Sequence, residues 1–251
     1  MHKSKMNKRV FKLLSCILLM FASSQVSAYV LGPTTPGKWG PSTIGTGATV
    51  TWSLMGAGLA TDSGTSVALS SFMPAGFKTA ITAAFSAWSA VADLTFVEVV
   101  DPSVGWADPG AGVSDIRIGG HSFDGPFGTL AHGFYPPANG GTAAGDIHFD
   151  VAETWKIGFG GTGFDIFQVM AHELGHALGL NHTAVASSLM NPFYTEAYSG
   201  PQADDIAGMT YLYGPANTVS PVPEPKTLIL FILAVFMLFF GHKKNQHANL
   251  Q

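Results

Sequence analysis

The residues that most constrain the fold and the chemistry of this chain are His172-Glu173-Leu174-Gly175-His176-Ala177-Leu178-Gly179-Leu180-Asn181-His182. On an α-helix, residues four positions apart share one face, so His172 and His176 can bind the same ion. Gly179 can adopt a positive φ and end the helix, which would let His182 turn back towards the other two. Three imidazoles leave a zinc ion one open position for water, and Glu173 can take that water's proton. The spacing predicts a catalytic zinc site rather than a helix with solvent-facing histidines.

The other histidines are concentrated in the same part of the chain. Six of the nine fall within 62 residues, and the sequence contains one cysteine, Cys16. A lone buried histidine is usually structural, but six so close together are better explained as metal ligands. These six are His121, His132, His148, His172, His176 and His182.

Charge is divided unevenly along the chain. Residues 29–220 carry four basic side chains against 15 acidic ones, a net charge of −11. A domain this acidic repels phosphate backbones, so we expect no nucleic-acid partner. Its carboxylates could instead serve hard cations such as calcium.

Apolar patterning predicts an α+β fold with a single core. The expected helices cover roughly 75–92, 165–180 and 202–213, and the expected strands cover 48–54, 94–100, 114–118 and 145–149.

The zinc-binding string resembles the HExxHxxGxxH motif of the metzincins, and further segments are similar to the matrixins among them. Met190, in Ser188-Leu189-Met190-Asn191-Pro192, fits the methionine turn that these families place below the metal. Segment 123–134 (FDGPFGTLAHGF) and segment 145–155 (GDIHFDVAETW) look like two matrixin segments in family order. The resemblance covers roughly residues 38–215. It implies a mixed twisted sheet with three helices and a zinc endopeptidase activity.

The resemblance also implies further sites. In matrixins, histidines matching His132 and His148 hold a second, structural zinc, with His121 the expected third ligand. The aspartate that the family pairs with its first histidine is missing here. Three carboxylates match calcium ligands of the family: Asp124, Asp150 and Glu153. Two more match a second calcium site: Asp115 and Asp146. The specificity pocket would be shaped by Pro192, Phe193 and Tyr194.

The first 28 residues are typical of an export signal. Five basic side chains precede the apolar run Leu13–Phe21, and Val26-Ser27-Ala28 fits a cleavage site. The run is far shorter than the roughly 20 residues that span a membrane. We expect the protein outside the cytoplasm.

The last 32 residues form a second candidate sorting signal. A proline-rich linker (220–225) leads into the apolar stretch Thr227–Gly241 and then into His242-Lys243-Lys244. This order resembles the PEP-CTERM signal of Gram-negative bacteria, which implies an exosortase-type partner, transient or permanent membrane contact and a cell-envelope or extracellular location. A plain C-terminal anchor is the alternative.

These observations predict a signal peptide (1–28), a matrixin-like domain (29–219) and a sorting segment (220–251). The expected function is an exported zinc endopeptidase acting on protein or peptide substrates, with Glu173 as general base. The alternative is a surface-anchored matrix or adhesion protein whose zinc is not catalytic. Glu173 argues against it, because such a site needs no base.

Overall fold

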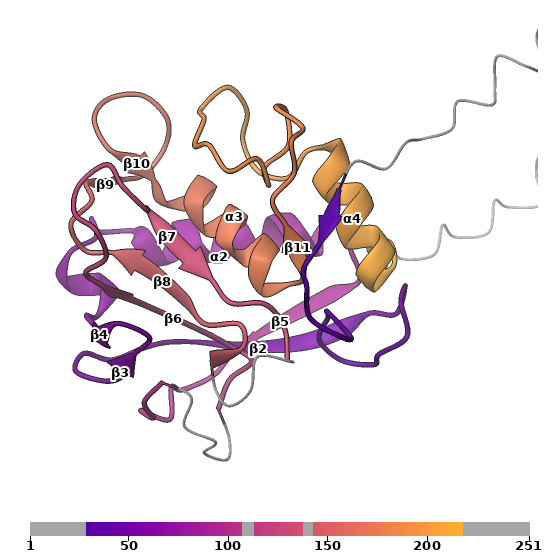
Figure 1. The fold of residues 1–251 in the computed structure, drawn as a ribbon, viewed down its shortest axis with the longest axis horizontal. Helices are drawn as coiled ribbons and strands as arrows, with labels where there is room; N and C mark the ends of the chain where they lie inside the picture. The colour runs from indigo at the N-terminus through magenta and orange to yellow at the C-terminus, as the bar shows by residue number, and fades with distance from the viewer. Residues whose placement is uncertain (1–28, 107–112, 138–142, 218–251) are drawn as a thin grey trace, which may run out of the picture. The chain divides into compact units, whose positions relative to one another are not determined.

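A mixed five-stranded sheet is the central layer of the computed structural model, which describes residues 29–106, 113–137 and 143–217. Its strands follow the order β5-β2-β6-β8-β7 (Figure 1). Within this sheet β7 alone runs antiparallel to its neighbour, and it lies at one edge. The strands are β2 (Ala48–Leu54), β5 (Leu94–Glu98), β6 (Ile116–His121), β7 (Ala131–Gly133) and β8 (Ile147–Asp150).

Three α-helices accompany the sheet in the described residues, as the sequence predicts, and the α+β class is confirmed. They are α2 (Phe77–Ser89), α3 (Ile166–Ala177) and α4 (Ala203–Tyr213), and a short 3₁₀-helix, η1, covers Leu69–Ser71. α3 packs against α2 and also contacts β7 and β8. It ends earlier than expected, because the backbone reverses at Gly179, whose φ is +109°.

Six two-residue strands form three small pairs outside the main sheet in the described residues. β1 (Val30–Leu31) pairs antiparallel with β11 (Leu180–Asn181), and β9 (Trp155–Lys156) pairs parallel with β10 (Phe164–Asp165). β3 (Ala60–Thr61) and β4 (Gly64–Thr65) form a hairpin. A strand of two residues is too short to show an alternation of apolar and polar side chains, so these pairs could not be predicted from the sequence.

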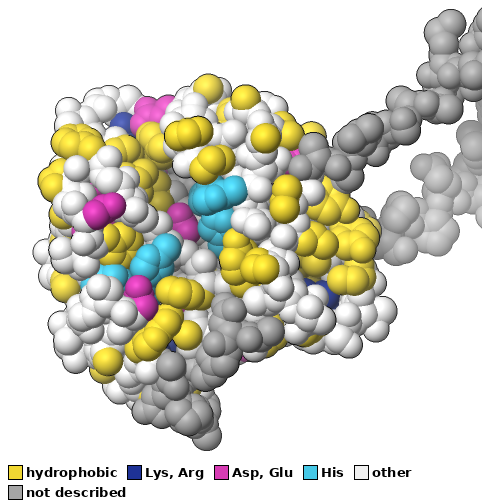
Figure 2. All heavy atoms as spheres, in the orientation of Figure 1, with side chains coloured by type: hydrophobic (Ala, Val, Ile, Leu, Met, Phe, Trp, Pro, Cys, Tyr) yellow, Lys and Arg dark blue, Asp and Glu magenta, His cyan; other side chains and the backbone are white. Residues whose placement is uncertain are grey.

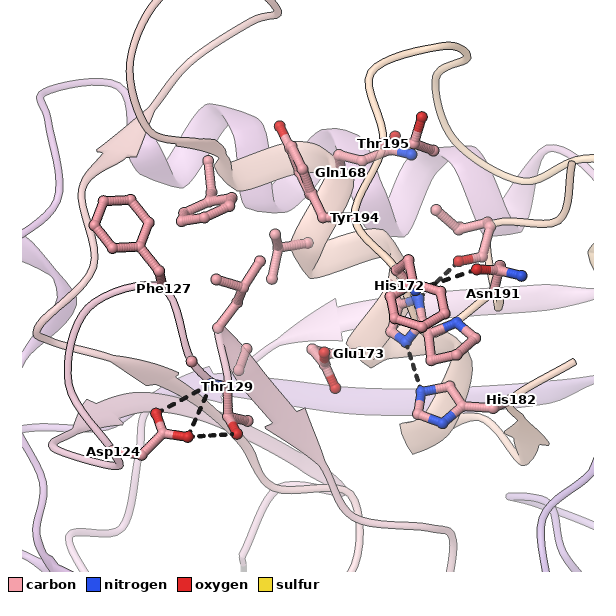
Figure 3. Close-up of a pocket in the computed structure, with 18 of the residues that line it drawn as sticks. Asp124, Phe127, Thr129, Gln168, His172, Glu173, His182, Asn191, Tyr194 and Thr195 are labelled. Carbon is pink, nitrogen blue, oxygen red and sulfur yellow. Dashed lines mark hydrogen bonds between the residues drawn. The ribbon is translucent and has the colours of Figure 1, made fainter. Parts of the chain in front are cut away.

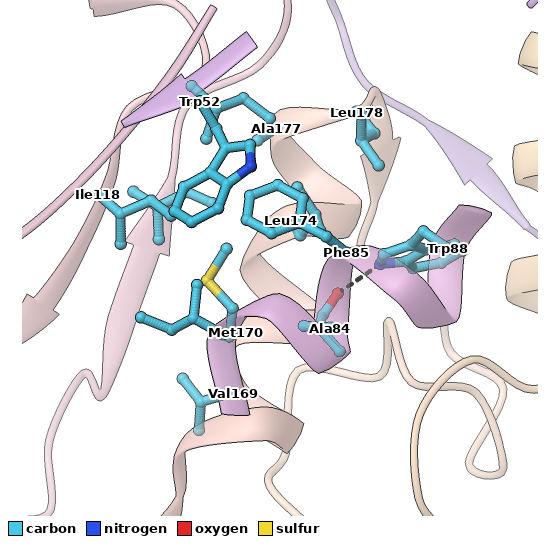
Figure 4. Close-up of a cluster of buried hydrophobic side chains, with 14 of the residues drawn as sticks. Trp52, Ala84, Phe85, Trp88, Ile118, Val169, Met170, Leu174, Ala177 and Leu178 are labelled. Atoms are coloured by element: carbon cyan, nitrogen blue, oxygen red, sulfur yellow. Dashed lines mark hydrogen bonds between the residues drawn. The ribbon is translucent and has the colours of Figure 1, made fainter. Parts of the chain in front are cut away.

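Aromatic and aliphatic side chains pack together in the core between the sheet and the helices (Figure 4). Phe85 of α2 stacks on Trp52 of β2, with ring centroids 4.7 Å apart. Trp88 is fully buried and donates its indole N–H to the carbonyl of Ala171 on α3, at 3.0 Å. Because a buried indole N–H needs a partner, this bond fixes how α2 and α3 face each other.

The two candidate sorting segments, 1–28 and 220–251, lie outside the described residues and stay predictions. Among the residues that the structure does describe, no helix has the length and apolar character to cross a membrane.

Replacing Gly179 with alanine should destabilise the protein strongly. A left-handed backbone costs a non-glycine residue roughly 1–2 kcal/mol. In addition, a Cβ here would come within 2.1 Å of the carbonyl oxygen of Gly37. We expect a loss of at least about 3 kcal/mol in the free energy of unfolding, measured by urea denaturation. Gly45→Ala is the control, because its φ is +80° but a Cβ would meet nothing within 4 Å. Equal losses in the two variants would contradict the role of the contact with Gly37.

Candidate active site and second metal centre

Helix α3 carries the first two histidines of the motif into a cleft (Figure 2). Asp165 begins the helix, and its carboxylate accepts a hydrogen bond from the backbone N–H of Gln168 at 2.9 Å. This cap satisfies an N–H group that the first turn leaves free. One turn apart on the same helix face, the rings of His172 and His176 have centroids 4.9 Å apart.

The reversal at Gly179 brings the third histidine to the other two. The Nε2 atom of His182 lies 3.2 Å from Nε2 of His172 and 3.1 Å from Nε2 of His176. Zinc–nitrogen bonds of about 2.0–2.1 Å in a tetrahedron separate the ligand nitrogens by roughly 3.3 Å. The three nitrogens therefore have the spacing of ligands to one tetrahedral ion, and the predicted cluster forms.

Backbone carbonyls orient two of these rings. Nδ1 of His172 lies 2.7 Å from the carbonyl oxygen of Leu189, and Nδ1 of His176 lies 2.8 Å from that of Leu180. Burial lowers the pKa of His172 to about 4 and that of His176 to about 3. Both imidazoles are therefore neutral at pH 7, with the proton on Nδ1 and the Nε2 lone pair free for a metal.

Glu173 is buried beside the histidines, and Figure 3 shows its carboxylate between the labelled histidines and Thr129. Burial raises the pKa of its carboxyl to about 8, partly offset by a hydrogen bond from the backbone of Gly133. This pKa applies without a metal ion, and a nearby divalent cation would favour the carboxylate. The geometry therefore places a carboxylate beside the metal-binding cluster.

The methionine predicted to lie below the metal packs directly against the helix. Met190 is buried, and a Cβ on Gly175 would come within 2.3 Å of its sulfur. Glycine at position 175 thus lets the Met190 loop approach α3 between the two histidines. The close packing agrees with the predicted methionine turn.

A buried carboxylate on α4 holds this loop in place. Asp205 accepts hydrogen bonds from the hydroxyl of Ser188 and from the backbone N–H groups of Leu189 (2.7 Å), Met190 (3.0 Å) and Gln202 (2.8 Å). From the sequence, Asp205 is predicted only to stabilise the first turn of a helix. Its contacts with the Met190 loop depend on the tertiary fold.

The cleft continues from Glu173 into a cavity of about 540 Å³. Leu130 and Ala131 line one side of it, next to the edge strand β7. All three predicted pocket residues line it as well: Pro192, Phe193 and Tyr194. The ring of Tyr194 meets that of Phe164 edge to face, with centroids 5.1 Å apart.

The other three histidines also meet, on three neighbouring strands of the sheet. β6, β8 and β7 supply His121, His148 and His132, and His132 is in register opposite His148. Nε2 of His132 lies 3.1 Å from Nδ1 of His148. These three histidines therefore lie together in the structure, and their binding of zinc stays a prediction.

Asp62, which the sequence did not indicate, lies beside these three histidines and is a fourth candidate ligand. Asp62, in the turn between β3 and β4, lies with Oδ1 3.1 Å from Nε2 of His121, 3.5 Å from Nε2 of His132 and 2.9 Å from Nδ1 of His148. Burial alone would raise the pKa of Asp62, but the hydrogen bond with His148 and the charges of the histidines lower it to about 2. The three histidines expected from the sequence thus gain Asp62 as a fourth candidate ligand.

The polar atoms of this second cluster fit a metal better than hydrogen bonds. Nε2 of His121 is buried without a hydrogen-bond partner, although Oδ1 of Asp62 is 3.1 Å away. Two polar atoms that lie this close without forming a hydrogen bond are typical of two ligands that bind the same ion. Three histidines and one carboxylate make a closed tetrahedral set, the arrangement of a structural zinc site.

The first set of calcium candidates does not form a comparable cluster. Asp124 accepts hydrogen bonds from the N–H and hydroxyl of Thr129, both at 3.0 Å, and Glu153 accepts one from the N–H of Phe127. Oδ2 of Asp150 is buried without a hydrogen-bond partner, which is compatible with a cation nearby. Calcium binding stays a prediction at this position.

The second pair of calcium candidates has other partners. The carboxylate of Asp115 accepts two hydrogen bonds of 2.8 Å from Thr51. Asp146 is buried, and one of its oxygens lies 3.8 Å from Nη1 of Arg117. The guanidinium supplies positive charge where the sequence suggested a metal ion, so this site too stays a prediction.

Comparison with known proteins agrees with this geometry. The family model described as matrixin matches residues 66–214, well over half of the chain. The chain therefore belongs to the matrixin family.

Individual relatives include bacterial and animal proteins. Karilysin from Tannerella forsythia is 40% identical over 151 residues, which are 57% of this chain and 30% of karilysin. Human stromelysin-3 is 44% identical over 140 residues, which are 52% of this chain and 26% of stromelysin-3. Human matrix metalloproteinase-20 is 42% identical over 149 residues, which are 54% of this chain and 27% of that relative. The chain thus matches less than a third of the length of each of these relatives.

Replacing Asp205 with asparagine should loosen the Met190 loop. The amide keeps the shape of the carboxylate but turns an NH₂ donor towards N–H donors, leaving buried groups unpaired. We expect a loss of about 1–3 kcal/mol in the free energy of unfolding. Urea denaturation measures it, and Glu98→Gln, at an exposed carboxylate, is the control. A variant as stable as the wild type would contradict the anchoring role of Asp205.

Proposed function

We propose that this chain is an exported zinc endopeptidase that hydrolyses internal peptide bonds of proteins or peptides. The observation that carries the proposal is the buried carboxylate of Glu173 beside three convergent imidazoles. Membership of the matrixin family supports it.

The catalytic roles follow from the chemistry of the cluster. His172, His176 and His182 would hold the zinc ion, which when bound lowers the pKa of water and polarises a carbonyl. Glu173 accepts the proton of the attacking water at its carboxylate and passes it to the amine that leaves. Burial favours the protonated form that the second step needs.

The substrate would bind in an extended conformation along β7. This strand lies at the edge of the sheet, next to the helix that carries Glu173. A peptide can extend such a sheet through backbone hydrogen bonds, while its side chains enter pockets. The cavity beside Pro192, Phe193 and Tyr194 would take the residue after the scissile bond, and its aromatic lining favours an apolar side chain.

The second cluster would hold a structural zinc ion with Asp62, His121, His132 and His148 as ligands. It joins the β3–β4 hairpin to three strands of the main sheet. Such an ion binds the folded state only, so its binding free energy adds to the stability of the fold.

Three parts of the chain then have separate tasks in this proposal: residues 1–28 direct export, 29–219 are the catalytic domain, and 220–251 are a sorting segment for an exosortase-type enzyme of a Gram-negative bacterium. The apolar stretch 227–241 would contact the membrane, transiently or as an anchor. The composition of these segments supports this division.

Glu173→Gln should abolish turnover and leave zinc in place. The glutamine cannot accept the proton of water, so we expect kcat to fall roughly 10²–10⁴-fold. Cleavage of casein and of a quenched peptide library by the full chain measures this loss, with and without a zinc chelator. Elemental analysis checks that zinc is retained.

Two outcomes would contradict this assignment. Loss of zinc from Glu173→Gln would give Glu173 a structural role. A folded, zinc-loaded wild-type chain without any cleavage would favour the alternative of a surface-bound matrix or adhesion protein. His176→Ala, which removes a ligand, should lose both zinc and activity.

Asp62→Asn should weaken the second zinc site and spare the first. An amide oxygen is a poorer ligand than a carboxylate, and we expect affinity at this site to fall at least about tenfold. Elemental analysis after dialysis against a competing chelator should find two zinc ions per wild-type chain and one per variant chain. Glu98→Gln, at a carboxylate of the edge strand β5 paired with Lys78, is the matched control. If the Asp62→Asn variant still retained two zinc ions per chain, Asp62 would not be a ligand of the second zinc.

A further inference from the structure

A polar cluster, here named the Glu196 clasp, joins two loops beside the cavity. It consists of Lys156 at the end of β9, Tyr194 and Glu196 in the loop after Met190, and the backbone N–H of Gly160. Nζ of Lys156 lies 2.6 Å from Oε1 of Glu196. The sequence analysis attached no role to Lys156 or Glu196.

Each oxygen of Glu196 has a donor. Oε1 accepts from the hydroxyl of Tyr194 at 2.7 Å, and Oε2 accepts from the N–H of Gly160 at 2.6 Å. Hydrogen bonds from Lys156, Gly160 and Tyr194 lower the pKa of Glu196 to about 2. The carboxylate therefore stays charged across the pH range in which a peptidase works, and the clasp stays closed.

Lys156 also binds the loop between β9 and β10. Its ammonium group donates to the carbonyl of Gly160 at 2.9 Å and is only partly exposed to solvent. That loop contains four glycines with positive φ: Gly158, Gly160, Gly161 and Gly163. A loop so rich in glycine has little conformational preference of its own, so the polar contacts determine its position.

The clasp fixes the wall of the cavity through Tyr194. The hydroxyl of Tyr194 donates to Glu196 and accepts from the backbone N–H of Asp165 at 2.9 Å. Asp165 begins α3, the helix that carries Glu173. These two hydrogen bonds hold the hydroxyl of Tyr194, and its ring makes an edge-to-face contact with Phe164.

We propose that the Glu196 clasp is a specificity-determining device, in which Lys156 and Glu196 act as positioning residues for the Tyr194 wall of the substrate cavity. This inference rests on the proposed endopeptidase function. A rigid wall discriminates between side chains by size, because a poorly fitting side chain cannot displace it. The clasp narrows the set of apolar residues accepted after the scissile bond, and it contacts neither the zinc histidines nor Glu173.

The experiment compares substrate profiles of clasp variants in the full, zinc-loaded chain. Quenched peptides that differ only in the residue after the scissile bond (alanine, leucine, phenylalanine and tryptophan) are cleaved by wild type, Lys156→Met, Glu196→Ala and the double variant. We expect the spread of kcat/KM across the series to shrink at least about fivefold in each single variant, mainly through KM. The double variant should reduce the spread of kcat/KM little further than either single variant, because each single change already opens the same clasp.

The chain offers a matched control for the loss of an ion pair. Lys78 and Glu98 also lie 2.6 Å apart and join α2 to β5, but both are exposed and Tyr194 takes no part in this pair. Lys78→Met and Glu98→Ala should leave the substrate profile unchanged. Zinc content and the melting temperature should stay near wild type in both sets, because partly exposed ion pairs contribute little to global stability.

Hydrogen exchange gives a readout that does not depend on turnover. Amides of residues 157–163 and 191–199 should exchange at least about tenfold faster in Glu196→Ala than in wild type, with α2 unchanged. Cleavage by the variants with a wild-type profile, or unchanged exchange in these loops, would overturn the clasp proposal alone. Absence of cleavage by the zinc-loaded wild type would instead overturn the proposed function, and with it the role of the clasp in specificity.

Discussion

The reversal of the backbone at Gly179 is the constraint on which the active site depends. The N–H of Gly179 donates to the carbonyl of His176, and its own carbonyl accepts from the N–H of Gly32. The turn therefore ends α3, ties the helix to the N-terminal strand β1 and directs β11 back towards the helix. Without it, His182 would continue around the helix and face away from His172 and His176.

The segment after His182 connects metal binding with substrate selection. Met190 fills the space under α3 that Gly175 leaves open, and Asp205 anchors the same loop from α4. A few residues later this loop supplies the Tyr194 wall of the cavity. The carbonyl of Leu189, in turn, orients His172. One loop thus contacts the zinc histidines at its start and the candidate substrate pocket at its end.

The two histidine clusters are assembled in different ways. The first takes all its ligands from eleven consecutive residues, so helix geometry and one turn suffice to form it. The second takes them from three strands and a hairpin, between Asp62 and His148. Their convergence requires the register of β6, β8 and β7 and the approach of the β3–β4 turn. This second cluster exists only when the sheet is complete, which suits a role in stability.

The α+β class, the three helices and the first histidine cluster could be predicted from the sequence, because helical periodicity and the spacing of histidines within one short segment are local properties. The sequence also indicated that His121, His132 and His148 meet. The tertiary structure alone decided that Asp62 joins them, that Asp205 holds the Met190 loop, and that Lys156 reaches Glu196. The partners in these contacts are separated by 15 to 86 residues in the chain. A sequence pattern carries no period at such distances, and only the packing of sheet, helices and loops sets them side by side.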